Sequence, residues 1–277
     1  MNNFKRKVEH TLLFFYHLDF KYILPGITLL SLQAFYYICC TILKKHTAHK
    51  LLRNIEVVIS LDKIKFSLNT IPNDLGFIFE NFIHKSYESV NDFVPQNGDT
   101  CLDIGANIGD CTLSWYQHNR EGKIICCEPH PESFKRLQKN LILNDCANIE
   151  PIALAISNKD QLLEIFIDRN SSMVVINSDS KNAKTKYTVQ AYTLDHLVKE
   201  KSLTKIALCK IDVEGHELEV LKGAKETLKI TERLIIECHS EVLNKKVKEI
   251  IGQRFTIVKE IGKRFSLIFA ERKIDAA

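Results

Sequence analysis

The chain has 277 residues, of which 45% are hydrophobic and 26% are charged, and its formal net charge is +4. Residues 1–50 contain seven Lys or Arg against two Asp or Glu and carry +5, which leaves a net charge of about −1 on the rest of the chain. Because the basic excess lies at the N-terminus, the remaining residues do not support a nucleic-acid-binding groove, and no nucleic acid is expected as a partner. The length allows one large α/β domain with an appendage.

The nine cysteines are odd in number and lie mostly within apolar runs, without a paired C-x-x-C arrangement. This pattern favours free thiols in a reducing compartment. It predicts no metal site.

The first element in chain order is an uncharged run of 22 residues over 22–43. As a helix it would span about 33 Å, which is enough for a hydrocarbon core of about 30 Å. The run predicts an N-terminal apolar helical segment over residues 1–50 that associates with a membrane through residues 22–43, followed by a domain over residues 51–277. Pro25 and Gly26 interrupt the run, so a pair of helices packed on the domain or on a second copy is the alternative. The oligomeric state stays open.

The domain begins with two β-prone runs, 55–61 and 65–68, that suggest a small hairpin, and helical periodicity follows over 74–89. Helices and strands then alternate. The predicted helices cover 110–119, 131–142, 194–200, 216–229 and 240–251. After a first central strand that ends near residue 102, the predicted strands cover 123–128, 148–156, 162–168, 188–193, 205–212, 233–238, 255–260 and 265–271.

The polar stretch 169–186 lacks periodicity and predicts a long loop, either a lid over a binding site or a solvated linker. Gly262 and Lys263 join the last two strands like a hairpin turn. The order predicts an α/β fold with a doubly wound, Rossmann-like sheet and a C-terminal antiparallel hairpin. That ending is typical of a class I methyltransferase.

A glycine turn follows the first central strand in the run DIGANIGD over residues 103–110. Gly105 and Gly109 lack a Cβ, so the backbone can turn tightly and approach a ligand at the start of the next helix. Glu128 ends the next strand, 25 residues after Asp103, a distance that suits hydrogen bonds from a carboxylate to ribose hydroxyls. The pattern indicates a nucleotide-binding site.

Two more apolar runs end in polar residues, the first at Asp212 and the second at Glu237, Cys238 and His239. In an open parallel sheet, ligands bind at the carboxyl ends of the strands. Acidic residues also follow strands simply as helix caps. Because four strands share the feature, we interpret this edge as a binding site.

The quoted runs resemble the FkbM family of S-adenosylmethionine-dependent methyltransferases. The resemblance covers most of residues 90–240 and excludes the first 50. The matching segments are DIGANIGDCTL at 103–113, CEPHPESFKRLQKNLILN at 127–144, the serine pair at 171–172 before Met173, YTLDHL at 192–197, KIDVEGHELEVLKGA at 210–224 and IIECH at 235–239.

The resemblance implies S-adenosylmethionine as cofactor and O-methylation of a small-molecule or glycan hydroxyl. It implies that residues 153–157 border the adenine. This cofactor and the free thiols together predict a catalytic domain in the cytoplasm, with or without a membrane anchor. The residues it would use are Asp103, Gly105, Asn107 and Gly109 around the methionine portion, Glu128 at the ribose, and Asp212, Glu214 and His239 at the methyl group and acceptor.

A hydroxyl acceptor must also lose its proton. His239 is the better general base by its ordinary pKa, and Asp212 is the better by its expected position. His239 could instead cap the following helix, and Asp212 could orient the turn at Gly215. Both roles stay open at this point.

Three other functions share part of this sequence pattern with O-methylation. A nicotinamide-dependent oxidoreductase would share the glycine turn, but the chain has G-x-x-x-G and no Tyr-x-x-x-Lys pair. A nucleic-acid amino-methyltransferase would carry an Asn/Asp-Pro-Pro-aromatic turn where this chain has DVEG at 212–215. A catalytically inert, membrane-tethered binding protein on the same scaffold is the third alternative.

Overall fold

The computed structural model describes residues 57–68, 74, 76–168, 174–176, 183–262 and 265–274. The predicted N-terminal helical segment, its run 22–43 and the boundary at residue 50 lie outside these residues and stay predictions. Within the described ranges, no helix has both the length and the apolar character needed to cross a membrane. The chain divides into two compact units, Met1–Ser86 with Lys139–Asp145, and Tyr87–Gln138 with Cys146–Ala277.

The first unit contains the predicted hairpin. Strands β1 (Val57–Leu61) and β2 (Ile64–Leu68) pair antiparallel, which confirms that prediction. A π-helical segment, Ile78–Ile83, lies where longer helical periodicity was predicted. The rings of Phe66 and Phe82 meet edge to face at 5.1 Å between centroids, so this unit has a small apolar core of its own.

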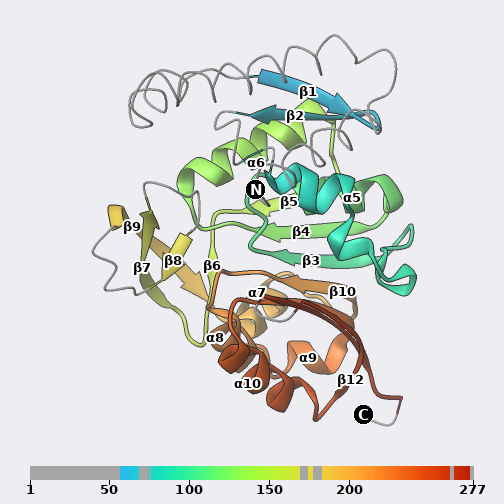
Figure 1. The fold of residues 1–277 in the computed structure, drawn as a ribbon, viewed down its shortest axis with the longest axis vertical. Coiled ribbons are helices and arrows are strands. Elements are labelled where there is room, and N and C mark those ends of the chain that lie inside the picture. Colours follow the sequence, from blue (N-terminus) through green and yellow to red (C-terminus); the bar gives the residue numbers. More distant parts are fainter. Residues whose placement is uncertain are drawn as a thin grey trace, which may run out of the picture. The chain divides into compact units, whose positions relative to one another are not determined.

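The second unit is built on a seven-stranded sheet in the order β12-β13-β11-β10-β3-β4-β5. The five strands from β11 to β5 are parallel, and β13 pairs antiparallel with β11 and β12, so the predicted doubly wound sheet with a terminal hairpin is confirmed (Figure 1). The strands are β3 (Thr100–Ile104), β4 (Lys123–Cys127), β5 (Ile149–Ile152), β10 (Ile206–Ile211), β11 (Thr231–Cys238), β12 (Phe255–Ile261) and β13 (Ser266–Arg272).

The central strands read as continuous apolar runs because they are buried on both faces. Every residue of β10 is buried, and Lys210 is its one charged member. The buried cysteines among the described residues form no disulfide, in agreement with the predicted free thiols.

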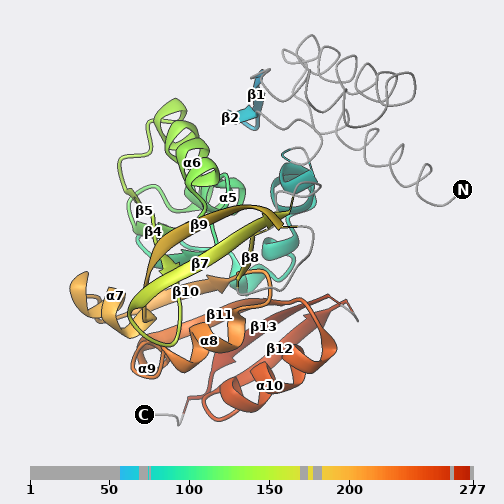
Figure 2. The ribbon, with the colours of Figure 1, turned by 90° about the vertical axis from the view of Figure 1, so that its left-hand side faces the viewer.

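The helices flank this sheet (Figure 2). Helices α8 and α10 pack together against β11, whereas α5 packs against β4. The helices are α5 (Asp110–His118), α6 (Pro131–Leu143), α7 (Leu194–Glu200), α8 (Glu217–Lys222), α9 (Thr227–Ile230) and α10 (Glu241–Ile251).

The single helix predicted over 216–229 is wrong, because α8 and α9 are separate. Helix α8 ends at Gly223, whose backbone lies close to the backbone of Ser157. A Cβ at Gly223 would lie 2.2 Å from the carbonyl oxygen of Ser157, so only glycine permits this approach.

A second, four-stranded sheet was not predicted. Its order is β6-β9-β7-β8, and its strands are β6 (Ala155–Ile156), β7 (Gln161–Asp168), β8 (Val174–Ile176) and β9 (Ala183–Tyr192). The predicted strand 148–156 is therefore two strands in different sheets, and the predicted loop 169–186 contains β8 and the start of β9. Thr185 and Lys186 are exposed, so this part of β9 carries no apolar signal and is held by pairing with β7.

Gly105 sets how closely β3 and β10 approach at their carboxyl ends. Its φ is +86°, and a Cβ built on it would lie 1.7 Å from the carbonyl oxygen of Asp212. Main-chain atoms cannot move aside as the end of a side chain can, so an alanine here would force the two strand ends apart.

We expect Gly105→Ala to lower the free energy of unfolding by about 3 kcal/mol or more, from backbone strain and the main-chain clash together. Gly98→Ala is the matched control, because Gly98 has a φ of +96° but no atom within 4 Å of an added Cβ. It should lose only about 1–2 kcal/mol. Denaturant unfolding compares the two variants, and equal losses would show that the close approach does not constrain the fold.

Candidate active site

The predicted meeting of four polar strand ends at one edge is confirmed by the sheet order. Strands β4, β3, β10 and β11 are parallel neighbours, so their carboxyl ends lie side by side. The chain runs outward from β3 to β4 and β5 and returns on the other side of β3 as β10. The order of the strands therefore reverses between β3 and β10, where an open α/β sheet offers its binding site.

The glycine turn forms the β3 side of this edge. The backbone N–H groups of Gly105 and Ala106 donate to the carbonyl oxygen of Cys127, at 2.9 and 3.0 Å. Asn107 has a φ of +48°, and Gly109, with a φ of +88°, precedes the first residue of α5. A Cβ on Gly109 would lie 2.7 Å from the end of the Leu137 side chain, which can shift, so the positive φ is the main reason for glycine here.

Glu128 follows β4 with its carboxylate held by two main-chain donors. The N–H of Asn107 donates to one oxygen and the N–H of His130 to the other, each at 2.8 Å. Burial raises the pKa of Glu128 to about 7, although both hydrogen bonds act in the opposite direction. The glycine turn thus fixes the direction of the predicted ribose ligand.

Asp103 lies at the core of the site and is fully buried. One of its carboxylate oxygens accepts from the hydroxyl of Thr112 at 2.5 Å, and the other from the ammonium of Lys210 at 3.0 Å. Both oxygens are thus engaged within the protein. Asp103 can act on a ligand through these two neighbours, and its predicted place beside the methionine portion stays a prediction.

Lys210 joins several parts of the edge. Its ammonium also donates to the carbonyl oxygen of Gly105 at 3.1 Å, lies 3.7 Å from Asp212, and sits 5.0 Å from the centre of the Tyr87 ring. Burial alone would lower the pKa of Lys210, but the charges of Asp103 and Asp212 outweigh it and the pKa is raised. The lysine therefore remains a buried cation.

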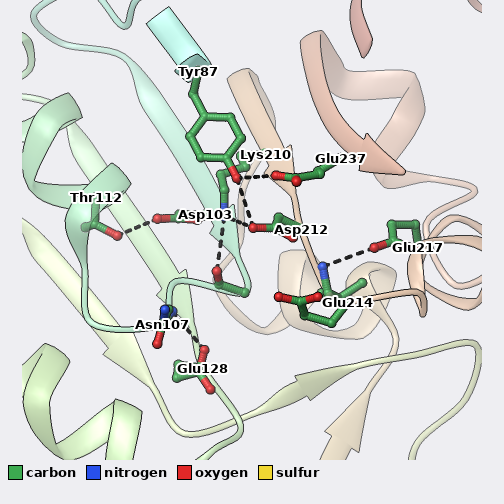
Figure 3. A network of polar contacts seen from close by, with 12 residues as sticks. Tyr87, Asp103, Asn107, Thr112, Glu128, Lys210, Asp212, Glu214, Glu217 and Glu237 are labelled. Atoms are coloured by element: carbon green, nitrogen blue, oxygen red, sulfur yellow. Dashed lines mark hydrogen bonds and ion pairs between the residues drawn. The ribbon is translucent and has the colours of Figure 1, made fainter. Parts of the chain in front are cut away.

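Asp212, Tyr87 and Glu237 form a second group at the ends of β10 and β11 (Figure 3). The Tyr87 hydroxyl lies 2.9 Å from Asp212 and 2.7 Å from Glu237. It has one proton, so it donates to one carboxylate at a time. Burial raises the pKa of Tyr87, and the two negative charges raise it further, so the phenol stays protonated.

His239 follows β11 and faces carboxylates on both sides of its ring. Its Nδ1 lies 3.0 Å from Glu217, and its Nε2 lies 3.1 Å from Glu214 and 3.7 Å from Asp212. Burial would lower the pKa of His239, but these carboxylates raise it to about 11. With both nitrogens protonated at neutral pH, the ring cannot accept another proton, and this arrangement disfavours His239 as the general base.

A third polar contact lies beside the residues predicted to border the adenine. His216 lies just before the start of α8, and its Nε2 is 2.9 Å from the Ser157 hydroxyl. Burial lowers the pKa of His216, so its ring is neutral and structural. The serine pair at 171–172 lies outside the described residues.

Sequence reasoning missed Lys210 and Tyr87. A signal for Lys210 was present, because it is the one charge within a buried apolar strand and lies opposite Asp103 in the β3–β10 pairing. No such signal marks Tyr87, which lies in a short 3-10 turn, Ser86–Glu88, far from either carboxylate in sequence.

The sequence profile described as the methyltransferase FkbM domain matches residues 103–265, more than half of the chain. A hexuronic acid methyltransferase, AglP, of Haloferax volcanii is 29% identical over 163 residues, which are 57% of this chain and 63% of that protein. Methyltransferase 1 of Beauveria bassiana is 25% identical over 51% of this chain and 66% of its own. The 2-O-methyltransferase NoeI of Sinorhizobium fredii is 25% identical over 57% and 71%, respectively. The match thus spans less than two thirds of the first two relatives.

We expect Lys210→Met to lower the free energy of unfolding by about 3–5 kcal/mol, because it leaves the buried Asp103 charge without its cation. Lys229→Met is the control, since Lys229 forms an exposed ion pair with Glu226 and should cost about 0.5 kcal/mol or less. A double variant that also carries Asp103→Leu should regain part of the loss. Denaturant unfolding measures all three, and a similar loss in both single variants would contradict a central role for the buried pair.

Proposed function

The chain belongs to the FkbM methyltransferase family, and we propose that it transfers a methyl group from S-adenosylmethionine to a hydroxyl oxygen of a small molecule or glycan. The observation that carries the proposal is the Glu128 carboxylate, buried and aimed by two main-chain donors at the edge where the strand order reverses. The opposite side of that edge presents acidic residues to an acceptor.

The residues at this edge fit S-adenosylmethionine. Glu128 would accept hydrogen bonds from the two ribose hydroxyls, and its fixed direction lowers the entropic cost of that contact. Gly105, Asn107 and Gly109 form a turn without bulky side chains beside the methionine portion, and Asp103 supports it through Lys210. When bound, the cofactor supplies a methyl group on a sulfonium, which is already activated for transfer.

The work left to the protein is alignment and removal of one proton. Transfer requires the acceptor oxygen, the methyl carbon and the sulfur to lie in line, at near-attack distance. We propose the carboxylates of Asp212 and Glu214 as acceptors of the hydroxyl proton. His239, held as a cation by its neighbours, would orient them and offset their charge.

A carbohydrate-type hydroxyl is the proposed acceptor. The names of two relatives state methylation of a hexuronic acid and at a 2-O position, and we transfer the chemistry of a sugar hydroxyl to this chain as a proposal. The acidic residues that follow β10 and β11 would repel a phosphate backbone, which supports the expectation that nucleic acid is not the substrate.

The alternative functions differ in the residues they need. Hydride transfer by a nicotinamide enzyme lacks its Tyr-x-x-x-Lys proton donor in this sequence. An inert scaffold would not need Glu128 to keep two main-chain donors in a buried position.

We also propose that residues 22–43 attach the chain to a membrane, because this uncharged run is long enough to span one, with the enzyme in the cytoplasm.

The proposed activity predicts release of S-adenosylhomocysteine when the full chain is mixed with S-adenosylmethionine and sugars with free hydroxyls.

Glu128→Ala should weaken cofactor binding about 10- to 150-fold, because it removes two charge-assisted hydrogen bonds worth about 1.5–3 kcal/mol. Glu121→Ala, at an exposed acidic position, is the control and should bind normally. Calorimetric titration decides: unchanged affinity in Glu128→Ala, or tighter binding of NADH than of S-adenosylmethionine by the parent, would refute the assignment.

The same titration has a pH signature. With its pKa near 7, Glu128 is about one-tenth ionised at pH 6 and almost fully ionised at pH 8. Because the ionised form is the better acceptor, the parent's Kd should rise about tenfold from pH 8 to pH 6. Titration of the cofactor's own amino group affects parent and Glu128→Ala alike, so only the parent should show the additional change.

A further inference from the structure

Beyond the proposed methyl-transfer residues, one cluster has the donor set of a metal site. Asp212, Glu217 and His239 each offer one ligand atom, and these atoms lie within 4.8 Å of one another. Two ligand atoms of one ion are separated by at most twice the metal–ligand distance, which is about 4 Å for Mg²⁺ and about 5 Å for Ca²⁺. The three atoms are therefore close enough to share a single ion after small side-chain shifts. Glu214 adds a carboxylate oxygen 3.1 Å from His239 Nε2.

Unsatisfied carboxylate oxygens concentrate in this cluster. In the part of the chain that the structure describes, four buried side-chain polar atoms have no hydrogen-bond partner, and three of them belong to Asp212, Glu214 and Glu217. Glu217 is completely buried, and its Oε2 is one of the three. Glu214 Oε2 lies 3.1 Å from His239 Nε2, so Asp212 Oδ1 and Glu217 Oε2 are the two oxygens farthest from any donor. A buried carboxylate oxygen without a donor is costly, and a cation at this point would account for both.

The local charge is also unbalanced. Four carboxylates, those of Asp212, Glu214, Glu217 and Glu237, lie within 4.0 Å of a His239 ring nitrogen. Lys210 lies 3.7 Å from Asp212 but is shared with the buried Asp103. Within the described ranges, the cations found against these four carboxylates are Lys210 and His239 itself, so a divalent ion would offset the charge that these two leave uncompensated.

Glu217 orients the histidine through one carboxylate oxygen, Oε1, and leaves the other, Oε2, without a donor. Its Oε1 accepts from the main-chain N–H groups of Gly215 at 3.0 Å and Val213 at 3.3 Å, and lies 3.0 Å from His239 Nδ1. These contacts fix the ring and turn Nε2 toward Asp212 and Glu214. A carboxylate on one nitrogen with a cation at the other is a common arrangement of metal-bound histidine.

We propose that Asp212, Glu217 and His239, with Glu214 beside them, bind one divalent cation of the Mn²⁺ type. One imidazole among carboxylate oxygens suits an ion between the hard Mg²⁺ and the softer Zn²⁺. If the proposed function holds, on which this role rests, the ion would hold the acceptor oxygen and lower the pKa of its hydroxyl. Asp212 would then be a ligand, and Glu214 would take the hydroxyl proton. His239 would bind the ion through Nε2 as a neutral imidazole, so binding would release the proton that this nitrogen holds when no ion is bound.

The test is titration of the full-length chain with MnCl₂, with free Mn²⁺ followed by electron paramagnetic resonance and no cofactor present. We expect one ion per chain at micromolar Kd. Asp212→Asn and His239→Gln should each raise the Kd at least about tenfold, because each removes one ligand. Glu226→Gln, which changes an exposed acid outside the cluster, should bind as the parent does.

Thermal unfolding shows whether each variant is folded, and Mn²⁺ should raise the melting temperature of the parent and of Glu226→Gln but not that of the ligand variants. Failure of the parent to bind Mn²⁺ below millimolar concentration, or equal binding by folded ligand variants, overturns the inference. Methyl transfer that persists with a strong chelator and no bound ion also overturns it and leaves the proposed function standing. Retained Mn²⁺ binding with no binding of S-adenosylmethionine would instead refute the proposed function and support the cation site.

Discussion

The buried ion pair between Lys210 and Asp103 is the interaction on which the rest of the site depends. It bridges the two strands between which the strand order reverses, and the same ammonium reaches the carbonyl oxygen of Gly105. The absence of a Cβ on Gly105 lets the two strand ends come close enough for these contacts. Charge pairing and backbone packing therefore fix a single position for the glycine turn.

The edge of the sheet carries acidic residues on both sides of this ion pair, in two different environments. On the β4 side, two main-chain donors hold one buried carboxylate, Glu128, and no described cation is bonded to it. On the β11 side, carboxylates lie around His239, and within the described ranges their negative charge exceeds that of the cations paired with them. The first arrangement suits a neutral diol, and the second suits a positively charged ligand or a hydroxyl that must lose a proton. The two sides of the edge are thus chemically distinct.

Much of the fold and part of the site could be predicted from the sequence. The parallel strands are buried runs that end in a polar residue, so the sequence predicts Glu128 and Asp212 at strand ends. Their strands run parallel in one sheet, on either side of β3. The second sheet was missed because the start of β9 is polar and exposed, and pairing with β7 rather than apolar burial holds it. Likewise, no metal site was predicted, since Asp212, Glu217 and His239 have no regular spacing and meet only when β10, α8 and β11 assemble.

Tyr87 bears on where the functional module begins. The match to the family starts at residue 103, yet the phenol that contacts Asp212 and Glu237 lies sixteen residues earlier. The segment between them is also anchored, since Phe93 packs on Phe269 and the Arg233 side chain donates to the carbonyl oxygen of Asp92. A fragment that began at residue 103 would keep the whole family match and still lose the phenol that contacts Asp212 and Glu237. In this chain, the candidate site therefore begins earlier in the sequence than the family match does.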